Sequence, residues 1–128
     1  YMKIKFYWYF DDVEQHKLMP AVEIKCVDEK TINCLHGVLT DDAGINSITW
    51  LEKGVEIFKE VENSCNSTIW DRDAWGSEYT DGRVKLYSLY DDEYYVYLSL
   101  DSFRDILNAW VDFNRAPPDL ESYIYLEI

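Results

Sequence analysis

Basic residues, cysteine, glycine and proline are all scarce in this chain of 128 residues. Only 12 Lys and Arg stand against 25 Asp and Glu, which gives a formal net charge of −13 at pH 7. A field of that size repels nucleic acids and anionic membrane surfaces, so neither is expected as a partner. It favours a basic protein or cations, and it favours a monomer. No run of about 18 apolar residues is present, so the sequence predicts no membrane-spanning helix.

The N-terminus lacks the basic, then apolar, then small-residue pattern of a signal peptide. The three cysteines, Cys26, Cys34 and Cys65, are an odd number, which favours reduced thiols over a disulfide framework. These two features predict a cytoplasmic protein whose cysteines are small core residues. The alternative is a disulfide between Cys26 and Cys34, which requires a hairpin centred on Lys30.

Sequence motifs of catalysis are also missing. The chain contains no G-x-G-x-x-G, no P-loop and no G-x-S-x-G. Its two histidines, His16 and His36, have no cysteine at zinc-type spacing. A dyad of Cys34 with His36 lacks an orienting group and an oxyanion site. We therefore predict no enzyme activity, no catalytic or metal-binding residues and no cofactor.

Apolar and aromatic residues are abundant, at 48% hydrophobic with 11 Tyr and 5 Trp. Only five Gly and three Pro are present, and no internal repeat is visible. This composition supports one hydrophobic core, so residues 1–128 are predicted to form a single domain.

The segment 83–113 has the clearest periodicity. Apolar residues alternate with polar ones over 83–88 and again over 94–100, which predicts two strands joined by an acidic turn. Five apolar residues then follow at helical spacing: Phe103, Ile106, Leu107, Trp110 and Val111. Such a stripe can cover the apolar face of the hairpin. Asp101 or Ser102 is the expected helix cap.

The same reasoning along the chain predicts strands at 3–10, 21–28, 31–40, 66–71 and 122–128, a helix at 47–62 and a loop at 73–82. The element order becomes β-β-β-α-β-β-β-α-β. Hairpin connections dominate this order, so we predict an α+β domain with a largely antiparallel sheet of about six to seven strands and two packed helices.

Acidic residues gather in the predicted connections. If both helices return along the sheet, three acidic loops fall on one rim, and two aromatic residues lie beside it. The predicted partner-binding residues are Asp11, Asp12, Glu14, Asp41, Asp42, Asp71, Asp73, Trp75, Glu78, Tyr79 and Asp81. Trp75 and Tyr79 are the expected aromatic anchors, since Tyr and Trp bury a large area with little loss of rotamer freedom. Asp91, Asp92 and Glu93 form an alternative acidic edge at the opposite end.

Seven tyrosines fall on the strand faces opposite the aliphatic residues: Tyr7, Tyr9, Tyr87, Tyr95, Tyr97, Tyr123 and Tyr125. They predict either a second buried layer under a helix or an exposed aromatic surface. Stacking of RNA bases on such a surface is disfavoured by the missing basic groove.

A small, acidic, Tyr- and Trp-rich α+β chain ending in the helix LDSFRDILNAWVDF and a short strand resembles the immunity proteins of bacterial toxin–immunity systems. The resemblance is closest to those that guard against contact-dependent growth-inhibition toxins. It implies a cytoplasmic inhibitor that binds one cognate toxin domain one to one. That domain is commonly a nuclease, for which a ribonuclease is favoured over a deoxyribonuclease.

Two alternatives come from the residues themselves. The first is a small metal-dependent hydrolase that uses the acidic segment 71–81 as an oxygen cage for a divalent cation. The second is a non-catalytic subunit or adaptor of a larger assembly, in which acidity serves only solubility.

Overall fold

The computed structural model describes residues 1–41, 47–63 and 68–128. The strands in this part of the chain are β1 (Met2–Asp11), β2 (Lys17–Cys26), β3 (Ile69–Asp71), β4 (Trp75–Thr80), β5 (Arg83–Ser88), β6 (Tyr95–Ser99) and β7 (Tyr123–Glu127). The helices are α1 (Glu29–Thr40), α2 (Ser47–Lys59) and α3 (Leu100–Arg115). None of the helices in these ranges combines the length and the apolarity needed to cross a membrane.

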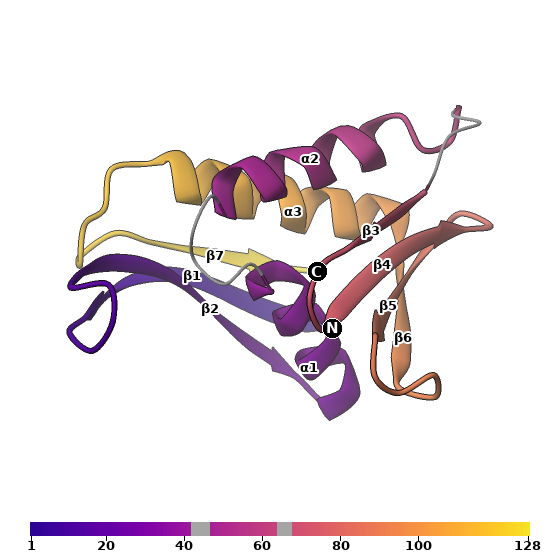
Figure 1. The fold of residues 1–128 in the computed structure, drawn as a ribbon, viewed down its shortest axis with the longest axis horizontal. Coiled ribbons are helices and arrows are strands. Elements are labelled where there is room, and N and C mark those ends of the chain that lie inside the picture. Colours follow the sequence, from indigo (N-terminus) through magenta and orange to yellow (C-terminus); the bar gives the residue numbers. More distant parts are fainter. Residues whose placement is uncertain (42–46, 64–67) are drawn as a thin grey trace.

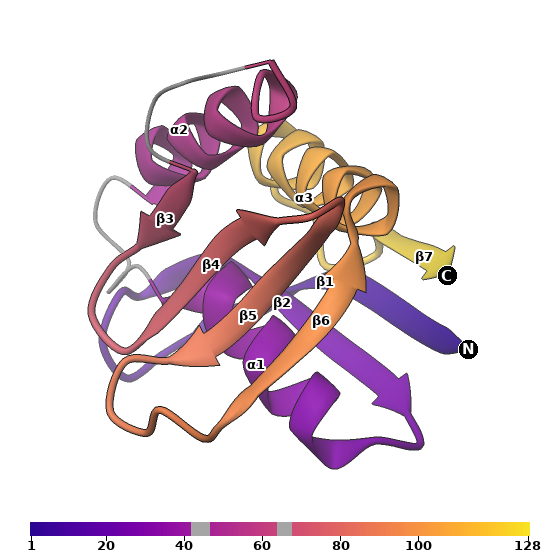
Figure 2. The same cartoon turned by 90° about the vertical axis from the view of Figure 1, so that its right-hand side faces the viewer.

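The strands form two antiparallel sheets instead of one. A three-stranded sheet has the order β2-β1-β7, and a four-stranded sheet has the order β3-β4-β5-β6. Helices α2 and α3 pack against each other along one side, while α1 contacts strands of both sheets (Figures 1 and 2). The predicted α+β class and antiparallel pairing are confirmed. The predicted single sheet is wrong, because the described strands divide into two sheets, and the predicted count of two helices is wrong, because one predicted strand is a helix.

That helix is α1, where the sequence predicted a strand at 31–40. Its buried residues include Cys34, Leu35, Val38 and Leu39, a helical stripe. A strand would have buried His36 together with Cys34, but His36 is exposed. The β-branched and polar residues of this segment also fit the two-residue period of a strand, so the helical period was not recognised.

The predicted loop at 73–82 contains strand β4. On its core-facing side, between Trp75 and Tyr79, lies Ser77, a fully buried residue whose hydroxyl donates to the Trp70 carbonyl at 3.0 Å. Its neighbour Gly76 faces outward, and a Cβ there would lie 2.7 Å from the Tyr87 ring, which covers the glycine. Because Ser77 and Gly76 are small and not apolar, β4 lacks a regular alternation of apolar and polar residues, and the sequence therefore did not predict this strand.

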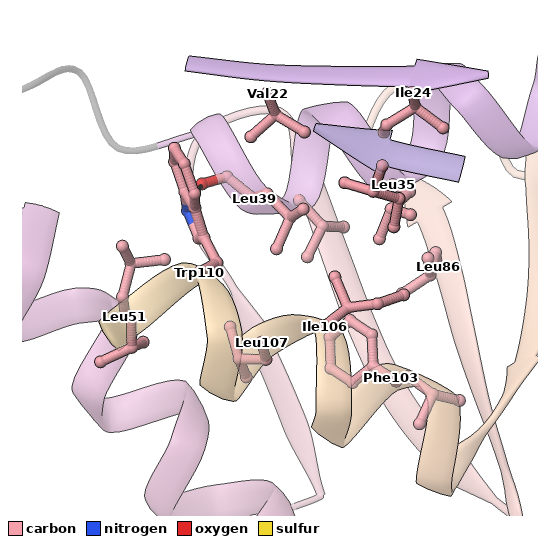
Figure 3. Packing of buried hydrophobic residues seen from close by; sticks show 14 of the residues in the cluster. Val22, Ile24, Leu35, Leu39, Leu51, Leu86, Phe103, Ile106, Leu107 and Trp110 are labelled. Atoms are coloured by element: carbon pink, nitrogen blue, oxygen red, sulfur yellow. Dashed lines mark hydrogen bonds between the residues drawn. The ribbon is translucent and has the colours of Figure 1, made fainter. Parts of the chain in front are cut away.

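Helix α3 is the element that connects both sheets to α1 and α2. The predicted stripe from Phe103 to Val111 is buried, and Trp110 Nε1 donates to the Leu39 carbonyl at 2.9 Å. Figure 3 shows these side chains pointing toward residues of β2, α1, α2 and β5, so that one core joins all the layers. The cap is Ser99, whose hydroxyl accepts from the Ser102 amide, so the expected caps Asp101 and Ser102 are wrong by two to three positions.

The two sheets contain the same local strand pair, which is an internal repeat that the sequence did not reveal. Lys-Ile-Lys-Phe-Tyr in β1 pairs with Tyr-Ile-Tyr-Leu-Glu of β7, and Arg-Val-Lys-Leu-Tyr in β5 pairs with Tyr-Val-Tyr-Leu-Ser of β6. The registers agree, since Lys5 is opposite Tyr125 just as Lys85 is opposite Tyr97. Each edge strand therefore presents two tyrosines on its outer face.

These outer faces are not covered by a helix. Within each edge strand, the two tyrosine rings contact each other edge to face. Their centroids are 5.5 Å apart in β7 and 5.7 Å apart in β6. Lys3 lies over the Tyr125 ring and Arg83 over the Tyr97 ring, at 4.6 and 4.0 Å. Of the two predicted arrangements, the tyrosines thus form exposed aromatic surfaces, one on each sheet.

Candidate functional site

Asp41, at the C-terminal end of α1, ties that helix to the turn between β3 and β4. Its Oδ2 accepts hydrogen bonds from the backbone amides of Asp73, Ala74 and Trp75, at 3.1, 2.8 and 2.8 Å. The predicted closeness of Asp41 and Asp73 is therefore present in the structure. The Asp41 carboxylate is engaged in holding the turn, so its role is to position the acidic residues around it.

The turn between β5 and β6 joins the same end of the molecule. The Leu89 amide donates to the Ala74 carbonyl at 2.8 Å, and the Tyr90 hydroxyl donates to the Asp73 carbonyl at 3.0 Å. Asp91 accepts from the Glu93 amide at 3.0 Å, which fixes the acidic turn. The placement of Asp91, Asp92 and Glu93 at the opposite end is thus wrong. The sequence did not predict strand β4, which adds one more reversal of chain direction. Because β4 and β5 are antiparallel, the end of β5 lies beside the start of β4, and the turn that follows β5 lies near Asp73.

We call the resulting surface the turn cluster. It consists of Asp41, Asp71, Asp73, Tyr90, Asp91, Asp92 and Glu93. The structure positions the described ion pairs elsewhere, between Arg104 and Glu62 and between Arg115 and two acidic residues of α2 and α3. Arg72, inside the cluster's own turn, lies over the Trp50 ring at 5.3 Å. The carboxylates of the turn cluster are therefore not neutralised by a described salt bridge.

The aromatic residue of the turn cluster is Tyr90, which is not among the residues predicted from the sequence. Its side chain is 82% exposed while its hydroxyl is held by the Asp73 carbonyl. The signal in the sequence was its place directly before Asp91 and Asp92. The predicted anchors have other roles: Trp75 is partly buried against Gly37 of α1, and Tyr79 packs against the core.

A groove opens beside the turn cluster, between α1 and the starts of β4 and β6. Its volume is about 600 Å³, and it is lined by Ile32, Asn33, His36, Gly37, Thr40, Asp41, Trp75 and Tyr94. Asn33 Nδ2 donates to the Tyr94 hydroxyl at 2.8 Å across this groove. Aromatic walls and polar groups at the mouth give it the chemistry of a slot for a partner's side chain.

Most of the other predicted site residues lie away from the turn cluster, so the single shared rim is not formed. Asp11, Asp12 and Glu14 are at the tip of the β1–β2 hairpin, at the opposite end of the long axis from the β4–β5 turn with Asp81 (Figure 1). Glu78, on the outer face of β4, is the exception, because it lines a pocket together with Asp92 of the turn cluster. Asp42 lies outside the described residues.

Two of these positions have a local structural role. The Asp11 carboxylate accepts from the amides of Val13, Glu14 and Gln15, and the bonds from Glu14 and Val13 lower the pKa of Asp11 below its ordinary value of 3.8. Asp81 has a φ of 50°, the left-handed conformation of a tight turn. Both residues shape hairpin turns.

The segment 71–81 does not form the oxygen cage of the hydrolase alternative. Asp71 lies opposite Gly76 near the start of β4, and Asp81 follows the end of that strand. The about five residues of extended chain from Gly76 to Asp81 span roughly 16 Å, which separates the two carboxylates. Among residues 1–41, 47–63 and 68–128, no three His, Cys, Asp or Glu side chains are grouped so that they could hold a metal ion. On the outer face, burial and, secondarily, the carboxylates of Asp71 and Glu78 raise the pKa of Tyr87.

Cys26 and Cys34 are both free thiols, which rules out the alternative disulfide between them in this structure. Cys65 lies outside the described residues. Cys34 is 0% exposed, and burial raises the pKa of its thiol to about 11. It has the environment of an inert core residue.

We expect Cys34 of the native protein to resist alkylation at pH 7.5, because the reactive thiolate is scarce and shielded. Cys26, which is only half-buried, should react at least about tenfold faster. Iodoacetamide labelling followed by peptide mass mapping measures each cysteine separately, with urea-unfolded protein as the control. Equal native rates at the two positions would show that α1 does not bury Cys34.

Comparison of the chain with protein-family models, with curated proteins and with solved structures gave no match.

Proposed function

We propose that this chain is the immunity protein of a bacterial toxin–immunity pair, a cytoplasmic inhibitor that docks on a basic nuclease domain through the turn cluster. The observation that carries the proposal is the pair of hydrogen-bonded turns that hold exposed acidic side chains around Tyr90. Asp71, Asp73, Asp92 and Glu93 are all exposed there.

The chemistry of the partner follows from the charge. A nuclease must bind the phosphates of its substrate, so its cleft carries Lys and Arg. Carboxylates fixed on a rigid frame present a similar array of negative charge. They attract such a cleft over a distance and raise the association rate by one to three orders of magnitude. The net charge of −13 adds to this attraction.

Long-range charge attraction raises the association rate, whereas a side chain buried at the centre of the interface slows dissociation of the complex. Tyr90 suits this role because its ring is exposed while its hydroxyl is already hydrogen bonded to Asp73. A partner that buries this ring loses little conformational entropy. The groove beside Trp75 and Tyr94 lies next to the cluster and offers a place for a cationic side chain, since aromatic faces attract cations.

The test compares two charge reversals of equal size. Asp73→Lys with Asp92→Lys alters the turn cluster, and Asp12→Lys with Glu14→Lys alters the distant hairpin tip. With the nuclease domain encoded beside this protein, we expect the first pair to slow association at least about tenfold and the second to change it by less than about twofold. Loss of nuclease inhibition should follow the same order.

The matched pair keeps the total charge equal, so a general field effect would slow both variants alike. The proposal fails if the two variants associate equally fast, or if the hairpin-tip variant is the slower one. It also fails if the wild-type chain leaves a basic nuclease domain of its own locus fully active.

A further inference from the structure

Strand β7 ends the three-stranded sheet with an open backbone edge. Met2 and Ile128 exchange two hydrogen bonds, from Met2 N to Ile128 O at 3.0 Å and from Ile128 N to Met2 O at 2.9 Å. Because hydrogen-bonded pairs alternate in an antiparallel ladder, Leu126 and Ile124 also bond to β1. The amides and carbonyls of Tyr123, Tyr125 and Glu127 therefore point away from the sheet. Within the described residues β7 pairs only with β1, and Figure 2 shows the end of β7 at the rim of the molecule.

The opposite edge of this sheet is protected, and β7 is not. In β2 the outward-pointing positions include Pro20, which has no amide to donate to a further strand. Proteins usually block edge strands in this way, with proline, inward charges or bulges. β7 contains no proline and has a single charged residue, Glu127. An unprotected regular edge is a template for another strand.

We propose that β7 pairs antiparallel with β7 of a second copy of this chain, forming a weak two-fold dimer with a continuous six-stranded sheet. The sequence of the strand is self-complementary when the two-fold axis passes through Tyr125. Tyr123 then lies opposite Glu127 of the second copy, and all three outward backbone positions find partners. A two-fold interface requires this kind of self-complementarity.

The side chains match in the same register. On the core side, Ile124 is 40% exposed and meets Leu126 of the second copy, so each dimer buries two such apolar pairs. On the outer face, the two Tyr125 rings meet at the axis, and Tyr123 lies beside Glu127 of the other copy. The five cross-strand pairs are thus apolar, aromatic or hydrogen-bonding, with no like charges directly opposite.

The net negative charge of the chain opposes the dimer at long range. Lys3 lies over Tyr125 and Lys5 over Tyr123, so the local surface carries positive charge, whereas the turn cluster is on the other sheet. Salt screens repulsion between distant charges, so the dimer should become stronger as ionic strength rises. A pairing of five-residue strands is smaller than a standard interface, which makes the dimer weak.

The repeat in the fold provides a matched control. Tyr97 of β6 occupies the position equivalent to Tyr125 of β7, and its backbone also points outward. There, however, the core-side residues Val96 and Leu98 are partly buried, and α1 contacts the strand. Edge pairing at β6 would gain less apolar burial than pairing at β7.

The experiment measures dimerisation by sedimentation equilibrium at low and high salt. Tyr125→Glu places two carboxylates together across the axis, while in the monomer Lys3 and Lys5 compensate the new charge. We expect it to weaken the dimer at least about tenfold, and Tyr97→Glu to change it by less than about twofold. Backbone amide exchange of the wild-type chain is the second readout. The amides of Tyr123, Tyr125 and Glu127 should exchange more slowly as concentration rises, and those of Tyr95 and Tyr97 should not.

The inference is overturned if the wild-type chain stays monomeric at millimolar concentration and these amides show no dependence on concentration. It is also overturned if Tyr97→Glu weakens the dimer as much as Tyr125→Glu does. Should Tyr125→Glu fail to fold, the amide exchange of the wild-type chain alone decides the question. Binding of a different protein at β7 by a monomeric chain would count against the second copy as the occupant.

Discussion

Replacing Asp41 by alanine is expected to lower the free energy of unfolding by about 3 kcal/mol, a large effect for a surface aspartate. One carboxylate oxygen accepts three backbone amides of the β3–β4 turn, and alanine leaves all three without this partner. Bonds to a charged acceptor contribute more than bonds between neutral groups. Urea unfolding followed by tryptophan fluorescence measures the loss.

Two companion variants give the Asp41 result its meaning. Asp41→Asn retains an oxygen acceptor and should lose about 1 kcal/mol. Asp73→Ala removes a neighbouring exposed carboxylate that holds no turn, and its stability should stay within about 0.5 kcal/mol of wild type. If Asp73→Ala destabilises the protein as much as Asp41→Ala does, Asp41 is not the residue that specifically holds the β3–β4 turn. If the proposed function holds, the Asp41→Ala protein should also bind the proposed nuclease partner more weakly, because its turns lose their fixed positions.

Gly54→Ala in α2 is expected to destabilise the protein by about 2 kcal/mol, the opposite of what helix propensity predicts. Alanine in an exposed helix interior would stabilise by about 1 kcal/mol relative to glycine. Here a Cβ would lie 2.6 Å from the buried Trp70 ring, whose Nε1 donates to the Trp50 carbonyl at 3.2 Å. Overpacking of a well-packed core typically lowers stability by about 1–3 kcal/mol.

A double-mutant cycle checks the cause of the Gly54 effect. Trp70→Leu removes the ring that occupies the space above the glycine. In that background, Gly54→Ala should become neutral or stabilising, because only the helix propensity remains. An equal loss of stability in both backgrounds, measured by urea unfolding, would mean that Trp70 is not the obstacle.

The parts of the fold that sequence predicts best are those with long, regular periods. The hairpin β5–β6 is of this kind because apolar and polar residues alternate along both strands. The buried stripe of α3 is of this kind because its apolar residues recur at helical spacing over several turns. α1 was mistaken for a strand because Ile32, Cys34 and Val38 also fit a period of two. Only tertiary burial of Leu35 and Leu39 decides between the two periods.

The site was only partly predictable for the same reason. Missing β4 left the direction of β5 undefined, which placed Asp91 and Asp92 at the wrong end. Asp41 was found beside Asp73, but through the C-terminal end of a helix and not a strand. A carboxylate that accepts three amides from residues more than 30 positions away leaves no local signal in the sequence. The exposed ring of Tyr90 likewise depends on which turns come together.

The central claim is that the turn cluster docks on a cationic protein by charge. The most direct measurement is the association rate with the proposed partner, a basic nuclease domain, as a function of salt, for wild type and for the variant Asp71→Asn, Asp73→Asn, Asp92→Asn, Glu93→Gln. We expect the wild-type rate to fall at least about tenfold between low and high salt, and the variant's rate to be slower and nearly flat. An equal salt dependence in the two proteins would contradict the claim.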